Sequence, residues 1–156
     1  MQHVLLRVVL IAAGTACRLA AADLPEPIRL CTLLENLTGY EGKVVVVVGR
    51  FSFRENRRTL SEDKCGNHPG GALRITFDKS DAPPTPERLD MDGTAVRKIL
   101  KSVQQQTSLS KFKFGTADYD RWAVIYARVQ NTKSDHASPH LVCAGDSVLF
   151  FLVDRE

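Results

Sequence analysis

Five consecutive valines, Val44 to Val48, are the feature that most restricts how this chain can fold. β-Branched side chains lose rotamer freedom in a helix, and an uninterrupted apolar run is typical of a strand buried on both faces. Gly49 follows directly, at the point where a strongly bent strand would need a residue without a Cβ atom. We therefore expect residues 43–53 to form the long, bent first strand of a small β-barrel.

The first 22 residues have the layout of a secretory signal peptide. Arg7 precedes an apolar stretch, and a run of small alanines ends at Ala22. The apolar stretch is too short to span a bilayer, so we expect no stable membrane span. The expected division is a signal peptide over residues 1–22 and a single domain over residues 23–156, in a secreted, periplasmic or cell-envelope protein. Lipidation at Cys17, which follows a small residue, is the alternative form of processing.

The charge of the chain argues against a general nucleic-acid binder. Two of the 21 basic residues and none of the 18 acidic ones lie in residues 1–22, so the remainder is close to neutral. A domain of that kind lacks the electrostatic footprint that binding to many phosphates requires. Any binding of a polyanion would have to come from a local patch.

Three cysteines follow the predicted leader, namely Cys31, Cys65 and Cys143. In an oxidising compartment they favour one disulfide with one thiol left over. Pairing Cys31 with Cys65 closes the shortest loop, which in the chain-entropy treatment stabilises the fold by about 3 to 4 kcal/mol. We expect this bond, with a bond to Cys143 as the open alternative because Cys143 precedes the predicted last strand.

Hydrophobic periodicity predicts two helices and four further strands. Leucines at the i, i+3, i+4, i+7 spacing predict a helix over residues 30–37, and a second apolar stripe predicts one over residues 94–103. Strands are expected at residues 57–61, 72–77, 122–129 and 148–153. The predicted order is helix, three strands, helix, two strands.

This order is that of the OB-fold, a five-stranded Greek-key barrel. The expected fold class is therefore mainly β with two helices, and the competing architecture is an α+β domain with an open antiparallel sheet. Cys31 ahead of the strand start Gly42-Lys43-Val44, with Cys65 after the second strand, resembles a group of uncharacterised secreted bacterial proteins. That resemblance implies no known activity.

Basic residues gather on and beside the first predicted hairpin, interleaved with Phe51 and Phe53. They are Arg50, Arg54, Arg57, Arg58 and Lys64. OB-folds bind extended ligands over their second and third strands, with cations for charge and aromatic faces for stacking. We therefore hypothesise a non-catalytic binding module that takes an anionic ligand, a glycan or a protein through this hairpin and adjacent loops. The competing interpretation is a solvated face with surface ion pairs to nearby acidic residues.

Cysteines and histidines in two predicted loops have the spacing of zinc ligands. They occur as Cys65-x-x-His68 and as His136-x-x-x-His140-x-x-Cys143. Pairing of Cys65 in a disulfide argues against a metal, so no cofactor is predicted and a zinc-binding or hydrolytic domain is an alternative hypothesis. The sequence contains no nucleophile elbow, phosphate-binding loop or dinucleotide fingerprint, so no catalytic residue is predicted. A structural envelope protein is the third hypothesis.

Overall fold

The structure is a computed structural model that describes residues 25–66, 68–85, 93–110, 117–130, 138–145 and 148–151. The predicted signal peptide lies outside these ranges. The helices are α1 (Leu30–Glu35), α2 (Leu37–Tyr40) and α3 (Gly93–Gln106). The strands are β1 (Pro27–Arg29), β2 (Val44–Arg54), β3 (Arg57–Cys65), β4 (His68–Thr76), β5 (Tyr119–Gln130), β6 (His140–Val142) and β7 (Val148–Phe151).

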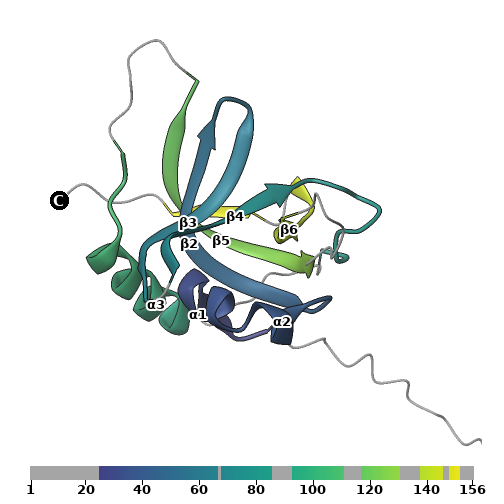
Figure 1. Cartoon of the computed structure of the whole chain (residues 1–156), viewed down its shortest axis with the longest axis horizontal. Coiled ribbons are helices and arrows are strands. Elements are labelled where there is room, and N and C mark those ends of the chain that lie inside the picture. The colour runs from purple at the N-terminus through teal and green to yellow at the C-terminus, as the bar shows by residue number, and fades with distance from the viewer. Residues whose placement is uncertain are drawn as a thin grey trace, which may run out of the picture.

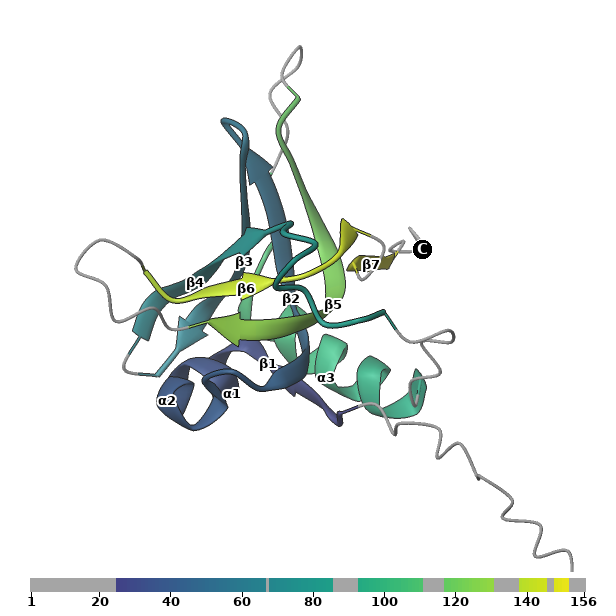
Figure 2. The same cartoon turned by 90° about the vertical axis from the view of Figure 1, so that its right-hand side faces the viewer.

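Within the described residues, five strands close into a barrel. β2 pairs antiparallel with β3 and β3 with β4, β4 runs parallel to β6, and β5 pairs antiparallel with both β6 and β2. This closed order, with α3 between the third and fourth strands of the ring, is that of an OB-fold. The predicted OB-fold-like, mainly β class is confirmed, and the open antiparallel sheet is wrong. Figures 1 and 2 show the β2–β3 hairpin projecting from one end of the barrel and α1 beneath the other.

The valine run forms the first half of β2, and its two faces pack against different parts of the molecule. Val45 and Val47 lie in the barrel core, whereas Val46 and Val48 pack with the apolar face of α3. β5 alternates in the same way, with Trp122 and Val124 on the α3 side. Its other face supplies Ala123, Ile125, Ala127 and Val129 to the barrel core. Both strands are apolar on two faces because a helix covers the outside of the wall at this point.

Gly49 lies where β2 packs closely against β3. A Cβ atom at this position would lie 3.0 Å from Cγ of Leu60 and 3.3 Å from the carbonyl oxygen of Ser61. Such contacts are tighter than ordinary packing allows, so a larger residue would force Leu60 to move. The expected need for a residue without a Cβ atom at Gly49 is confirmed.

The predicted first helix is divided into two short helices. α1 ends at Glu35 and α2 begins at Leu37, while Leu30 and Leu33 are fully buried in the barrel core. The second predicted helix is α3, with its apolar stripe on the outside of the barrel. Its buried residues are Val96, Leu100 and Val103.

The predicted last strand, residues 148–153, is present as β7 over Val148–Phe151, but its expected place as the fifth strand of the barrel is wrong. The barrel is closed by β6, which pairs with β4 and β5, while β7 pairs with β5 outside the ring. β6 is only three residues long, too short for periodicity to reveal it. The predicted loop after Cys65 is also wrong, because β3 and β4 continue to a tight turn at Gly66, whose φ is +42°.

Candidate functional site

The β2–β3 hairpin turns through Glu55 and Asn56. Both residues have positive φ, at 48° and 61°, as in the two-residue turns whose twist matches that of the flanking strands. The start of β5 runs alongside, with Tyr119 paired opposite Phe53. The three strand ends therefore stand together beyond the barrel core, as Figure 1 shows.

Three aromatic rings and two guanidinium groups gather at this end of the barrel. We call this group the hairpin-end cluster, and it comprises Phe53, Arg58, Phe77, Tyr119 and Arg121. The rings of Phe53 and Tyr119 are stacked with centroids 5.6 Å apart, and both pack against the barrel core. Phe77 follows β4 and is 41% exposed, so the cluster passes from the core to the surface.

Arg58 is held by two aromatic rings. Its guanidinium carbon lies 5.4 Å from the ring centroid of Phe53 and 4.8 Å from that of Phe77, within the range of cation–π attraction. Across the described part of the chain, no ion pair or hydrogen bond engages this guanidinium. Arg121 lies over Tyr119 at 5.0 Å. Each guanidinium of the cluster therefore lies over at least one aromatic ring.

Two other predicted basic residues have acidic partners. Arg50 forms an ion pair with Asp63 at 2.8 Å and donates to the carbonyl oxygen of Ser108 at 2.7 Å. Arg54 donates to both carboxylate oxygens of Asp120 at 3.0 Å. These pairs tie the hairpin to the segment after α3 and to β5. The pairing of Arg50 agrees with the surface-pair interpretation of the sequence.

The five predicted ligand-binding residues are distributed over different parts of the hairpin. Arg57 precedes Arg58 on β3, so their side chains start from opposite faces of the strand, and Arg57 is exposed. Lys64 is exposed at the far end of β3, next to Cys65. Of the five, Arg58 alone belongs to the hairpin-end cluster. A role in ligand binding stays a prediction for each of them.

Asp120 anchors the base of the hairpin. Burial alone would raise the pKa of its carboxyl, but hydrogen bonds from the Ser110 backbone, from Arg54 and from Ser52 outweigh burial and lower the pKa below its ordinary value of 3.8. Its side chain is fully buried, and the Ser110 N–H lies 2.8 Å away. The sequence indicated only a turn or strand edge at Asp118 and Asp120, because the partner Arg54 is 66 residues away along the chain.

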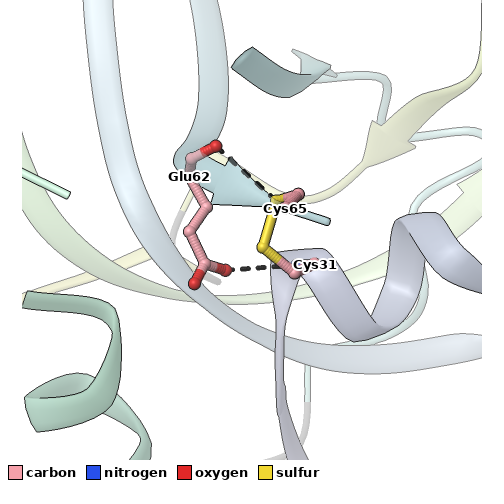
Figure 3. A group of neighbouring side chains, drawn as sticks. All are labelled: Cys31, Glu62 and Cys65. Carbon is pink, nitrogen blue, oxygen red and sulfur yellow. Dashed lines mark hydrogen bonds between the residues drawn. A yellow bond between two sulfur atoms is a disulfide. The ribbon is translucent and has the colours of Figure 1, made fainter. Parts of the chain in front are cut away.

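The Cys31–Cys65 disulfide is present, as predicted, and joins α1 to the end of β3 farthest from the hairpin turn. The fully buried carboxylate of Glu62 faces it and accepts a hydrogen bond from the Cys31 backbone N–H at 3.1 Å, as Figure 3 shows. Glu62 also forms an ion pair with Arg29. Among the described residues, no buried side-chain nitrogen or oxygen lacks a partner, so this network is complete within itself.

Among the described residues, Cys31, Glu62 and Cys65 form a group of side chains of the types that bind metal ions. Ligand atoms of Cys31, Glu62 and Cys65 lie within 4.8 Å of one another. The two sulfurs are bonded to each other, however, and metal binding requires thiolates. The Arg29 guanidinium already neutralises the carboxylate. In this oxidised form the group acts as a structural clasp.

The described candidates for zinc ligands lie on strands or in the barrel core. His68 opens β4 and His140 opens β6, so both are strand residues, which corrects their assignment to loops. His140 pairs with Arg74, well along β4 from His68, and its Nδ1 lies 3.1 Å from the carbonyl oxygen of Ser138. Cys143 is buried in the barrel core. The remaining candidate, His136, lies outside the described residues.

Comparison with known proteins gave no relative for this chain. A scan against protein-family models found no match, and searches of curated proteins and of solved structures found none either. Within the described ranges, no helix is long and apolar enough to cross a membrane. The disulfide is typical of proteins in oxidising compartments.

Proposed function

We propose that this protein is a secreted, non-catalytic binding module whose ligand site is the hairpin-end cluster. The observation that carries the proposal is Arg58, held between Phe53 and Phe77 with no ion pair or hydrogen bond from the described residues. Contacts with ring faces leave the N–H donors of a guanidinium available to an anion. Stacking also restricts the side chain in advance, which lowers the entropy lost on binding.

The composition of the cluster supports binding rather than catalysis. None of its five members is a carboxylate, a histidine or a cysteine, the groups that most often act as general bases or nucleophiles. Arginine and aromatic side chains are instead the types that carry most binding energy at interfaces. The exposed part of Phe77 provides an apolar surface beside the charge of Arg58.

Secretion is part of the proposal and has two supports. Residues 1–22 have the sequence pattern of a signal peptide. The Cys31–Cys65 disulfide requires an oxidising environment to form and persist. Detection of the processed protein outside the cytoplasm, with its N-terminus at Asp23, tests this part.

The binding site is tested with a matched pair of variants. The protein is titrated with oligonucleotides, anionic glycans and peptides while backbone amide resonances are followed by NMR. Arg58→Gln is expected to weaken every hit by about tenfold or more, because hydrogen bonds to charged groups contribute about 1.5 to 3 kcal/mol. Arg57→Gln removes the same charge from the opposite face of β3 and is expected to leave affinity unchanged within about twofold.

Arg58→Gln is first checked for an unchanged circular dichroism spectrum, so that loss of binding reports on the site. If the folded variant bound each hit as tightly as wild type, the hairpin-end cluster would not be the ligand site. A larger effect of Arg57→Gln would move the site to the outer face of β3.

A further inference from the structure

The hairpin-end cluster combines one available guanidinium with an exposed ring and is bordered by acidic residues. Resting on the proposed function, we infer that its ligand carries a single carboxylate attached directly to a six-membered ring. This class includes aromatic acids and uronic acid sugars, which share one negative charge and a ring face that can pack on an aromatic side chain. The charge around the cluster, the position of Phe77 and the geometry of Arg58 each support this choice.

Acidic residues around the cluster disfavour a polyanion. Glu55 is exposed at the hairpin turn, and its backbone N–H donates to Asp118 at 3.4 Å. Asp78 follows Phe77, and hydrogen bonds from the side chain and backbone of Ser80 lower the pKa of its carboxyl, so it is ionised at neutral pH. A chain of phosphates bound along the hairpin end would meet these negative charges and be repelled. One anionic group directed at Arg58 avoids them.

The ring requirement follows from the exposed side chain next to Arg58. Phe77 is 41% exposed, and its ring centroid is 4.8 Å from the Arg58 guanidinium carbon. Ring pairs stack favourably with centroids about 4.5 to 7 Å apart. The guanidinium covers part of this ring, so a ligand ring that stacks on the part left exposed would lie near the guanidinium. Its charged group must then be attached to the ring itself, without a long spacer.

The charged group is inferred to be a carboxylate because of the fork geometry of arginine. A guanidinium donates two parallel hydrogen bonds to the two oxygens of a carboxylate. A phosphate monoester is also recognised by arginine, but it carries about 1.5 to 2 negative charges at neutral pH. The neighbouring Asp78 and Glu55 make the smaller charge of a carboxylate the better fit.

The test titrates the folded protein with benzoate, galacturonate, benzamide, phenyl phosphate and oligodeoxythymidine, with amide resonances of β3 and β5 followed by NMR. Benzoate or galacturonate is expected to bind at the cluster, and the one that binds identifies the aromatic or the sugar source. Benzamide, which lacks the charge, is expected to bind at least about tenfold more weakly. Arg58→Lys keeps the charge but loses the planar fork and is expected to weaken binding by about fivefold or more, whereas Arg57→Lys is not.

The outcomes separate this inference from the proposed function. Tighter, Arg58-dependent binding of phenyl phosphate or oligodeoxythymidine would overturn the ring carboxylate and leave the binding site in place. Equal binding of benzamide and benzoate would likewise overturn it, because charge would then play no part. Binding of any probe that is unchanged in Arg58→Lys and Arg58→Gln, or no binding by any probe, would overturn both.

Discussion

Gly71 lies where β4 passes α1 and the disulfide. A Cβ atom there would lie 2.5 Å from Cδ1 of Leu34 and 3.1 Å from the Cys65 sulfur. The leucine side chain can rotate away, but the bonded sulfur cannot, so Gly71→Ala is expected to lower the free energy of unfolding by about 1 to 3 kcal/mol. Urea denaturation measures this loss.

The matched control for this prediction is Gly145→Ala. A Cβ atom at Gly145 meets no described atom within 4 Å, so its stability is expected to be unchanged. If Gly71→Ala were as stable as this control, the close approach of β4 to the clasp would be wrong.

Asp120 makes stability depend on pH at the other end of the barrel. Because the pKa of the Asp120 carboxyl is lowered in the folded protein, the unfolded chain binds the proton more readily. The ionised carboxylate therefore stabilises the fold above the ordinary pKa of 3.8. This stabilisation is lost as the pH falls through the lower pKa of the folded protein. Asp120→Asn removes this contribution. The variant is expected to be less stable than wild type at pH 7, with a difference that shrinks below pH 3.8.

Urea denaturation of both proteins from about pH 7 to about pH 2 measures the dependence. A difference in unfolding free energy that stayed constant through the acidic range would show that the carboxylate charge of Asp120 does not stabilise the hairpin. A variant as stable as wild type at neutral pH would contradict the ion pair with Arg54.

At the scale of the elements, Arg29 connects three parts of the fold. Its guanidinium pairs with Glu62 of β3 and donates to Ser102 at 3.3 Å and to Gln106 at 2.8 Å, both on α3. β1 thereby joins the barrel wall to the helix outside it. The backbone N–H of Cys31 donates a hydrogen bond to the same carboxylate. This network and the disulfide therefore both hold α1 against β3.

Removing the disulfide tests how much this clasp contributes. The double variant Cys31→Ala, Cys65→Ala is expected to lose about 3 to 4 kcal/mol of unfolding free energy, since the bond closes a loop with a sequence separation of 34 residues. The circular dichroism spectrum is expected to stay the same, because the Arg29–Glu62 pair remains. Urea denaturation gives the value, and a loss under about 1 kcal/mol would show that the bond is incidental to stability.

Over the whole molecule, the disulfide and the proposed binding site are at opposite ends of the barrel. α1 and the disulfide close one end, and the hairpin-end cluster occupies the other, as Figure 2 shows for the elements concerned. Three arginines, Arg29, Arg50 and Arg54, have carboxylate partners that join elements of the fold. Arg58 is instead held by aromatic rings. This separation allows the cluster to be changed without removing the bonds that hold the barrel.

The amino-acid sequence by itself determined the features that depend on local pattern. The valine run predicts a doubly buried strand, the apolar stripe of residues 94–103 predicts α3, and the element order predicts the barrel. Cys31–Cys65 was also predictable, because few pairings were available and this one closes the shortest loop. The strand and the helix depend on residues that are neighbours in the sequence, and the disulfide is one of only three possible pairings of three cysteines.

Only the tertiary structure decided which strand closes the barrel and which arginine contacts aromatic rings in place of a carboxylate. β6 has three residues, and its place follows from parallel register with β4, which no local periodicity records. Arg54 meets Asp120 across 66 residues of sequence, and Phe77 reaches Arg58 only because the strand ends converge. Charge pairing and exposure are properties of residues brought together by long-range strand register, so the candidate site emerges from the folded barrel.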